Sequence, residues 1–328
     1  MKIGVDAGAL CADPKRRYGT YYFSLNLIKA LSLYDHLNEY FYYSFCPKPQ
    51  SFPKSEKIHY LKLLPKTAWM TVRLSVEERL HKKDIFLALN QASPYHTPAE
   101  IIAFSHGLSF INSPRLYPDL YKQLIAQLES MLRRSKFIIV SSEKVRDELL
   151  LINKSAENKI KVLPFGIPFD MLNHPASHKT LPAKGKFFLC VGMEHPIKNR
   201  EFITKAFKLF KEDKRFAEFK LIQAKSLDRA ELKKLYRGAT ALLTASHYES
   251  FNLPVLEALS QNCQVIGRSW SIIPEMKKYV FESNSLREFV ATMKKLAEGK
   301  KKTISLEKLK REFSWKTYVE SLKNCYNI

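Results

Sequence analysis

Short apolar runs alternate with stretches of helical periodicity along this chain. The runs are rich in Ile, Val, Leu, Phe and Tyr, which is typical of buried strands. They predict strands at Met1–Asp6, Glu39–Phe45, Ile58–Leu64, Ile85–Ala88, Ile101–Ser105, Phe137–Ser142, Lys159–Pro168, Phe187–Gly192, Lys220–Ala224, Ala239–Ala245 and Cys263–Gly267. Helical periodicity follows at Thr20–Leu33, Trp69–Lys83, Tyr121–Ser135, Glu143–Leu151, Asn199–Phe210, Asp228–Tyr236, from Leu253, and at Leu286–Ala297. This alternation predicts an α/β fold built on parallel sheets.

The length of 328 residues suggests about two domains. Residues 169–185 interrupt the alternation, because they contain several prolines and little apolar periodicity. We therefore expect an N-terminal domain over residues 1–168, a linker over 169–185 and a C-terminal domain over 186–312.

The stretch Ser246–Leu259 carries the most informative chemistry. It stands between the apolar runs 239–245 and 263–267, so the predicted order is strand, loop, helix, strand. Pro254 suits the first turn of a helix, where its missing N–H needs no partner. The helix should therefore begin near Leu253, with its free N–H groups at the carboxyl edge of a parallel sheet. That position favours an anionic ligand such as a diphosphate.

Two carboxylates, Glu249 and Glu257, flank this helix start. They would repel a diphosphate, so they should face hydroxyl groups. An ionised carboxylate accepts two hydrogen bonds from a vicinal diol, so Glu257 can bind a ribose while Glu249 reaches a sugar. The alternative is that both side chains only interact with the helix dipole, worth up to about 1 kcal/mol each.

The same stretch resembles the E-x7-E signature of GT-B glycosyltransferases, the retaining, family-4-like enzymes (glycosyl transferases group 1). The matching residues are Tyr248, Glu249, Phe251, Leu253, Pro254, Val255, Leu256, Glu257 and Ala258. The resemblance implies two Rossmann-like, doubly wound parallel-sheet domains that face a central cleft. It also implies that Ser250, Phe251, Asn252, Leu253 and Glu257 bind a nucleotide-sugar donor and that Glu249 acts in catalysis. Ser250 and Asn252 replace two glycines of the signature, and Asn tolerates a positive φ better than Ser does.

Two further loops resemble the donor-binding loops of this family. Val191, Gly192, Pro196, Lys198 and Asn199 match a V-G-x-x-x-P-x-K-N phosphate loop, with Met193 in place of an arginine. Gly19 and Tyr21 match a G-x-G-x-Y-like turn, with Arg17 in place of its first glycine. The resemblance implies that Gly19 and Gly192 bind the donor. It also implies that Lys198 neutralises the departing diphosphate, which is preorganised electrostatic catalysis.

The segment Ser105–Phe110 resembles the H-D-L-S-F motif of the family, with Gly107 in place of the aspartate. The resemblance implies that His106 lies near the transferred sugar and acts in catalysis. His106 follows a predicted parallel strand, and ligands of open α/β sheets bind at that end. Asn90 resembles an asparagine below the site, and Phe313, Ser314 and Trp315 resemble the start of the last helix. The resemblance implies that this helix, 313–328, packs back on the N-terminal domain.

The charge is strongly positive, since 54 Lys and Arg against 32 Asp and Glu give a net charge of +22. An anionic membrane surface would attract such a chain, at about 1 kcal/mol for each basic residue near the surface. The predicted helix 121–135 ends in Arg133 and Arg134. Its apolar stripe either packs on the core of the protein or belongs to a face that contacts anionic lipid. We find no zinc-finger spacing, RNP-like motif or basic tail, so we expect no specific nucleic acid partner. In a third interpretation, the positive charge serves only to keep the protein soluble.

The five cysteines Cys11, Cys46, Cys190, Cys263 and Cys325 are odd in number and scattered, which is typical of free thiols in a reducing cytoplasm. No apolar run approaches the length of a membrane span, and the first residues do not form a secretory signal. We therefore expect a cytoplasmic protein, with peripheral attachment to the inner face of the membrane as a further expectation.

The sequence lacks a Walker A motif, an HExxH motif, a D-x-D motif and any G-x-G, which removes the usual support for P-loop, dinucleotide-binding and metal-dependent chemistry. We expect no cofactor and no metal. The predicted function is transfer of a hexose from a nucleotide-diphosphate sugar to a glycan or lipid-linked acceptor, in cell-surface polysaccharide or glycolipid synthesis. The alternative is a degenerate GT-B protein that binds a nucleotide sugar or an anionic partner without turnover. A basic nucleic-acid-binding module is a third hypothesis.

Overall fold

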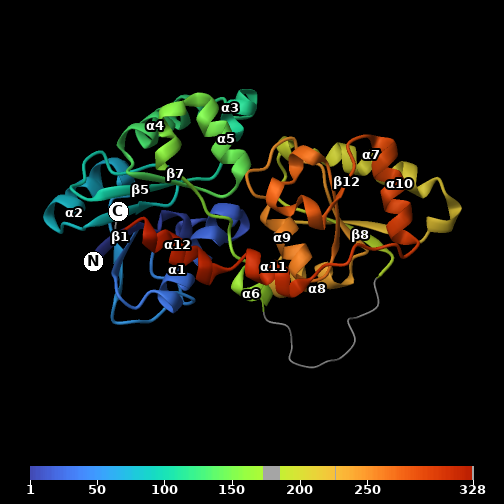
Figure 1. Cartoon of the computed structure of the whole chain (residues 1–328), viewed down its shortest axis with the longest axis horizontal. Coiled ribbons are helices and arrows are strands. Elements are labelled where there is room, and N and C mark those ends of the chain that lie inside the picture. Colours follow the sequence, from blue (N-terminus) through green and yellow to red (C-terminus); the bar gives the residue numbers. More distant parts are fainter. Residues whose placement is uncertain (173–184, 226, 327–328) are drawn as a thin grey trace. The chain divides into compact units, whose positions relative to one another are not determined.

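The computed structural model describes residues 1–172, 185–225 and 227–326. The chain divides into two compact units: unit 1 comprises Met1–Phe165 and Trp315–Ile328, and unit 2 comprises Gly166–Ser314 (Figure 1). The range expected to be a linker, 169–185, begins with helix α6 (Phe169–Leu172). Met171 of α6 is buried and the helix packs against α9 of unit 2, so this part is not a linker. Residues 173–184 of the expected linker lie outside the described residues.

Unit 1 is built on a parallel sheet of seven strands in the order β3-β2-β1-β4-β5-β6-β7. The strands are β1 (Lys2–Asp6), β2 (Glu39–Ser44), β3 (Ile58–Lys62), β4 (Ile85–Ala88), β5 (Glu100–Ser105), β6 (Phe137–Val140) and β7 (Ile160–Val162). All seven coincide with predicted apolar runs, although β7 is shorter than the expected 159–168. The parallel arrangement that the alternation predicted is confirmed.

Helices cover both faces of this sheet, as Figure 1 shows. They are α1 (Gly19–Tyr34), α2 (Leu74–Leu80), α3 (Ser109–Asn112), α4 (Tyr121–Arg134), α5 (Glu143–Ile152) and α12 (Trp315–Asn324). A short helical segment η1 (Gly8–Cys11) follows β1, and a π-helical turn η3 (Trp69–Arg73) leads directly into α2. The last helix, α12, packs against α1 within unit 1.

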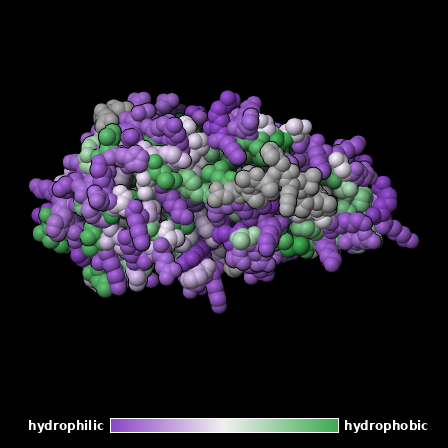
Figure 2. Space-filling model, turned by 90° about the horizontal axis from the view of Figure 1, so that it is seen from below, coloured by the Kyte–Doolittle hydropathy of each residue, from purple (hydrophilic) through white to green (hydrophobic). Residues whose placement is uncertain are grey.

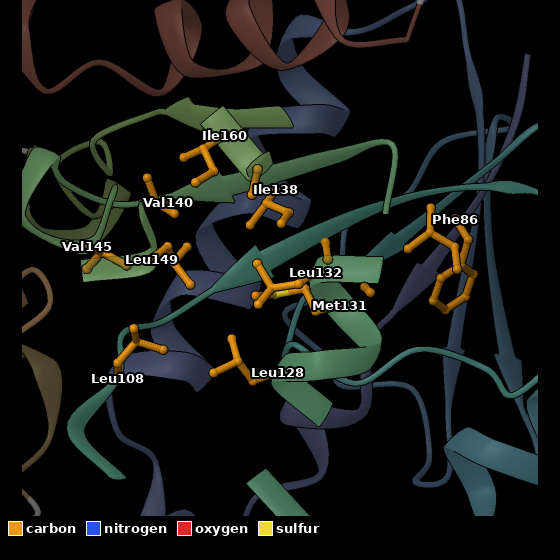
Figure 3. Packing of buried hydrophobic residues seen from close by; sticks show 14 of the residues in the cluster. Phe86, Leu108, Leu128, Met131, Leu132, Ile138, Val140, Val145, Leu149 and Ile160 are labelled. Atoms are coloured by element: carbon orange, nitrogen blue, oxygen red, sulfur yellow. The ribbon is translucent and has the colours of Figure 1, made fainter. Parts of the chain in front are cut away.

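One apolar core of unit 1 lies between the sheet and helices α4 and α5 (Figure 3). Leu128, Met131 and Leu132 of α4 are buried there, beside Ile138 of β6. The apolar stripe of α4 therefore faces the core, and Arg133 and Arg134 follow it at the carboxyl end, where cations interact favourably with the helix dipole.

Unit 2 is built on a parallel sheet of five strands in the order β12-β11-β10-β8-β9. The strands are β8 (Phe187–Val191), β9 (Lys220–Ala224), β10 (Ala241–Thr244), β11 (Gln264–Gly267) and β12 (Phe281–Glu282). The helices are α7 (Arg200–Lys211), α8 (Arg229–Gly238), α9 (Leu253–Ser260), α10 (Leu286–Ala297) and α11 (Leu306–Glu312). Asp228 caps α8 through the N–H of Glu231, and Ser285 and Glu288 form a capping box at the start of α10.

Both units thus have a parallel sheet with helices on its two faces, which confirms the predicted α/β class. Strand β12 and helices α3 and α11 have no counterpart among the predicted elements. Strand β12 and helix α3 are too short to show a hydrophobic period. Helix α11 buries Leu309, and a single buried position does not define a period.

The expectation of free cysteines is wrong for Cys11 and Cys46, which form a disulfide with Cα atoms 5.5 Å apart. The two residues are separated by 35 positions, but β1 and β2 are neighbouring parallel strands. Cys11 ends η1 after β1 and Cys46 follows β2, so the sheet brings them to the same edge. Cys190, Cys263 and Cys325 are free and buried, as expected.

Hydrophilic residues cover most of the face displayed in Figure 2, and hydrophobic residues form small separate patches on it. Within the described part of the chain, no helix combines the length and apolar character needed to cross a bilayer.

Candidate functional site

The two conspicuous loops of unit 2 meet at the carboxyl edge of its sheet. Strands β8 and β10 are parallel neighbours, so the loop after Val191 and the loop after Thr244 leave the sheet side by side. The N–H of His247 donates to the carbonyl of Ile197 over 2.7 Å and joins the two loops. The phosphate-loop match and the E-x7-E match, which lie 50 residues apart in the chain, therefore form one local structure.

Lys198 and Glu249 are in direct contact at this edge. Lys198 Nζ lies 2.6 Å from Glu249 Oε1, and their side chains are 16% and 12% exposed. The hydroxyl of Ser246 donates to the same carboxylate oxygen over 2.6 Å. The structure thus brings together the two residues of unit 2 that the sequence analysis assigned to catalysis. A diphosphate at this loop would compete with Glu249 for the ammonium group.

The backbone of Gly192 passes close to the Lys198 side chain. Its φ is +133°, which L side chains rarely adopt, and a Cβ there would lie 3.4 Å from Lys198 Cε. Lys198 ends the short helical turn η6 (Pro196–Lys198), and Asn199 then takes the left-handed conformation before α7 begins. Glycine at 192 therefore lets the lysine lie along the loop.

Asn252 takes over the conformational role of a signature glycine. Its φ and ψ are 66° and 63°, and it directly precedes α9, which begins at Leu253 as predicted. Its side-chain amide donates to Thr244 Oγ1 over 3.2 Å and to the carbonyl of Ser271 over 2.9 Å. Ser250, at the other replaced glycine, does not have a positive φ. Phe251 is 2% exposed and its ring packs against Phe313, so the ring is not available to a ligand and the donor-binding role of this residue stays a prediction.

Glu257 lies inside unit 2, with 2% of the residue exposed. Its Oε1 accepts from Arg229 over 2.7 Å and its Oε2 accepts from the Tyr236 hydroxyl over 3.0 Å. Burial raises the pKa of Glu257 above its ordinary value, although the Arg229 charge and both hydrogen bonds oppose that shift. Arg229 also binds Asp170 of α6. The two oxygens that would bind a ribose are thus already hydrogen-bonded, and the ribose role stays a prediction.

Sequence reasoning missed Arg229 and Tyr236 as partners of Glu257. Both belong to α8, which was predicted only as a helix over Asp228–Tyr236. A signal was present, because a carboxylate on a wholly apolar helix such as α9 needs a cation from a neighbouring helix when it is buried.

In unit 1, polar side chains gather where β1, β4 and β5 end. Asn90, which follows β4, donates to Asp6 Oδ2 over 3.0 Å, and the N–H of Gly8 donates to Asp6 Oδ1 over 2.9 Å. Burial raises the pKa of Asp6, and these two hydrogen bonds oppose the shift. Asp6 was predicted only as the end of a strand. Its place at the carboxyl edge of the sheet could have identified it as a candidate site residue.

His106 follows β5 at the same edge of unit 1. Its Nε2 lies 2.6 Å from the carbonyl oxygen of Leu89, which requires Nε2 to carry the proton and leaves Nδ1 as the acceptor of the neutral ring. Burial lowers the pKa of His106 to about 4, and the Leu89 hydrogen bond only partly opposes this. The ring also packs edge-on against Phe23. His106 is therefore neutral near pH 7 and can accept a hydrogen bond from a hydroxyl group.

Gly19 is the first residue of α1, and no heavy atom of the described chain lies within 4 Å of the position that a Cβ would take. Its role as a donor-binding glycine stays a prediction. The Arg17 guanidinium lies 4.7 Å from the centre of the Tyr21 ring, so the residue that replaces the first glycine stacks on the tyrosine of the same turn. Among the described residues, no group of three or more His, Cys, Asp or Glu side chains is arranged to hold a metal ion.

Comparisons with known proteins give matches in structure but none in sequence. No family model matches the chain, and no curated protein matches it. The structure resembles sucrose-phosphate synthase from Thermosynechococcus elongatus, with a TM-score of 0.70, 12% identity, and 99% of this chain and 98% of that chain covered. It also resembles Anabaena HepE in complex with UDP-glucose, with a TM-score of 0.67, 14% identity, and 99% and 100% covered.

A third similar structure is the lipopolysaccharide outer core galactosyltransferase WaaB, with a TM-score of 0.63, 15% identity, and 99% of each chain covered. Each likeness extends over nearly the whole length of both chains. The chain therefore has the two-domain α/β fold of the GT-B glycosyltransferases, as the resemblance of its sequence motifs implied.

Proposed function

We propose that this protein is a retaining glycosyltransferase that moves a hexose from a nucleotide-diphosphate sugar to a glycan or lipid-linked acceptor. The observation that carries the proposal is the contact of Lys198 with Glu249 at the edge where β8 and β10 end. A single ammonium beside a helix start supplies what a diphosphate needs, and a carboxylate beside it supplies an acceptor for sugar hydroxyls. The GT-B fold of the chain and the UDP-glucose complex of HepE support this assignment.

In the proposed reaction the bond from the anomeric carbon to the diphosphate breaks, and the acceptor oxygen bonds to that carbon from the same face. The proton of the acceptor hydroxyl passes to the freed phosphate oxygen. Lys198 and the N–H groups at the start of α9 stabilise the departing diphosphate. Glu249 holds sugar hydroxyls in the oxocarbenium-like transition state. The resemblance of Ser105–Phe110 to the family's H-D-L-S-F motif supports a role for neutral His106 as an acceptor for a sugar hydroxyl. The transfer that we propose needs no metal or cofactor, so added chelator should leave its rate unchanged.

We propose a role in cell-surface polysaccharide or glycolipid synthesis, and the basic character of the chain supports it. We propose that the protein acts in the cytoplasm and attaches peripherally to the anionic inner face of the membrane. The net charge of +22 is the observation that supports attachment.

The test is transfer from a panel of UDP, GDP and ADP sugars, with Lys198→Ala and Glu249→Ala beside the wild type. Loss of Lys198 should lower kcat by about a hundredfold or more, as for other groups that stabilise a developing anion. The double variant Lys198→Ala/Glu249→Ala should lower kcat by a much smaller factor than the product of the factors for the two single variants, because the two side chains are paired. UDP-glucose is the first donor to test.

Matched controls are Lys205→Ala and Glu201→Ala, which remove the same charges from exposed positions of α7. Both should transfer like the wild type. If wild type, Lys198→Ala and Glu249→Ala show the same background transfer while calorimetry detects nucleotide-sugar binding, the protein is a degenerate binder. Salt-dependent affinity for DNA or RNA without affinity for nucleotide sugars would favour the nucleic-acid-binding hypothesis.

A further inference from the structure

The helical segment formed by η3 and α2 packs on the core with Trp69 and Leu74, but it also buries its two carboxylates and exposes a row of aliphatic residues. Its acidic residues face inward, since Glu77 is 8% and Glu78 0% exposed. Three aliphatic residues face outward: Val72 at 60%, Val76 at 48% and Leu80 at 71% exposed. Their spacing of four positions places them in one row along the helix. A helix that packs on a core and meets water on its other side shows the opposite arrangement.

Two more exposed apolar residues lie beside this row. Leu64 is 56% exposed, and its carbonyl accepts from Arg73 Nε of η3 over 3.2 Å. Tyr95 is 82% exposed, and its N–H donates to the carbonyl of Thr71 over 3.2 Å. The row therefore widens into an apolar surface with one aromatic ring. Figure 1 shows α2 at the periphery of unit 1.

Exposed cations accompany these apolar residues. Arg79 belongs to α2, Lys82 follows two residues after the end of this helix, and Lys66 follows Leu64 closely in the chain. Arg134 donates to the carbonyl of Pro94 over 2.7 Å and so anchors the loop before Tyr95 to the basic end of α4. Its exposed neighbour Arg133 adds a further charge there. We call this set the η3–α2 surface: Leu64, Lys66, Val72, Val76, Arg79, Leu80, Lys82, Tyr95 and Arg133.

The two carboxylates of α2, Glu77 and Glu78, do not offset these cations at the surface. Glu77 binds Arg73 and His81, and Glu78 accepts from Thr97 inside the unit. The apolar side chains of the η3–α2 surface are thus accompanied by positive charge. Aliphatic and aromatic groups on a helix together with Lys and Arg are the combination that binds the interface of an anionic bilayer.

We propose that the η3–α2 surface is the face by which the protein docks on an anionic lipid bilayer. The inference deepens the proposed peripheral attachment and rests on it. The row of Val72, Val76 and Leu80 enters the headgroup and acyl boundary, and the cations contact lipid phosphates. Helix α4 contributes Arg133 to this contact but no apolar insertion, because Leu128, Met131 and Leu132 are buried in the core.

The test is co-sedimentation of the full chain with vesicles of phosphatidylglycerol and phosphatidylcholine, compared with phosphatidylcholine alone. Wild type should bind the anionic vesicles, less tightly at high salt, and bind the neutral ones weakly. Val76→Asp/Leu80→Asp should lower the affinity by about tenfold or more, since it removes insertion and adds like charge to the lipid. Arg79→Ala/Lys82→Ala should lower it by about fivefold for each lost charge.

The matched control is Leu37→Asp/Leu151→Asp, which makes the same change of charge at leucines that are 77% and 84% exposed elsewhere on unit 1. It should reduce affinity by less than about threefold. An equal loss in control and test would overturn the proposal, because net charge alone would then explain binding. Wild-type binding by Val76→Asp/Leu80→Asp, or no vesicle binding by the wild type, would overturn it too. Nucleotide-sugar transfer to a soluble acceptor, measured in the same variants, separates failure of docking from failure of the proposed activity.

Discussion

At the scale of single residues, Asn252 shows how a substitution in a glycine-rich signature can be compatible with the fold. The position needs a positive φ, and Asn adopts it with less strain than other non-glycine residues. The Asn side chain also does what glycine cannot, because it links the end of β10 to the Ser271 turn. The departure from the signature therefore adds contacts to the loop that carries Glu249.

Replacement of Asn252 by glycine and by alanine should separate these two effects. Asn252→Gly keeps the conformation but leaves Thr244 Oγ1 and the Ser271 carbonyl without this donor, so the free energy of unfolding should fall by about 1–3 kcal/mol. Asn252→Ala loses the same donor and adds strain of about 1 kcal/mol or more, so it should be less stable still. Urea unfolding measures the order Asn, Gly, Ala. A glycine variant as stable as the wild type would contradict the role given to the side-chain amide.

His106 gives a prediction about pH at the same scale. Its pKa in the folded protein is about 4, against an ordinary value of 6.5. Between these values the unfolded chain binds more protons than the folded one, so stability should fall as the pH drops from 6.5 toward 4. The contribution of this residue is about 3 kcal/mol at its largest, since one pKa unit corresponds to about 1.4 kcal/mol.

His106→Gln retains a donor for the Leu89 carbonyl and does not titrate. Its urea midpoint should therefore change less with pH in this window than the wild-type midpoint does. Equal slopes for the two proteins would mean that His106 is not the group that titrates. Because neutral His106 is also proposed to accept from a sugar hydroxyl, the variant should show a lower kcat near neutral pH.

At the scale of elements, the sequence predicted strands and helices well where one hydrophobic period extends over the whole element. The start of α9 at Leu253 was predicted from Pro254, and both loops at the edge of unit 2 were assigned to the right strand ends. Contacts between elements were harder to predict. The pairing of Cys11 with Cys46 requires β1 and β2 to be neighbours, and that of Glu257 with Arg229 requires α8 to pack on α9.

The segment η3–α2 shows a different reason for failure. Helical periodicity over Trp69–Lys83 was recognised, but the period does not say which side of the helix faces the core. Here the inward side carries Glu77 and Glu78. Glu77 pairs with Arg73 and His81, each four residues away in the chain, and Glu78 accepts from Thr97, which lies in a later loop. The sequence analysis therefore did not identify the apolar row of this helix as an exposed surface.

At the scale of the whole molecule, the order of elements in the chain differs from their order in space. Unit 1 contains the first 165 residues and also the last helix, while unit 2 is inserted between them. Trp315, Tyr318, Val319 and Leu322 of α12 are all buried within unit 1. Phe23 of α1 lies 6.2 Å from the Trp315 ring and 6.4 Å from the Tyr318 ring. The stability of unit 1 should therefore depend on residues that follow the whole of unit 2 in the sequence.

Truncation after Ser314 should destabilise unit 1 while unit 2 remains folded. Burial of each large apolar side chain is worth about 1.5–3 kcal/mol, so loss of the four on α12 approaches the whole stability of a typical domain, about 5–15 kcal/mol. Hydrogen exchange measured by mass spectrometry should show loss of protection in peptides of α1 and β1, and native protection in peptides of β10 and β11. A matched control, Lys316→Ala/Glu320→Ala, changes α12 at two exposed positions outside its buried side and should leave both units protected. Equal loss of protection in both units after truncation would show that they do not fold independently, and unchanged protection in α1 would show that α12 contributes little to unit 1.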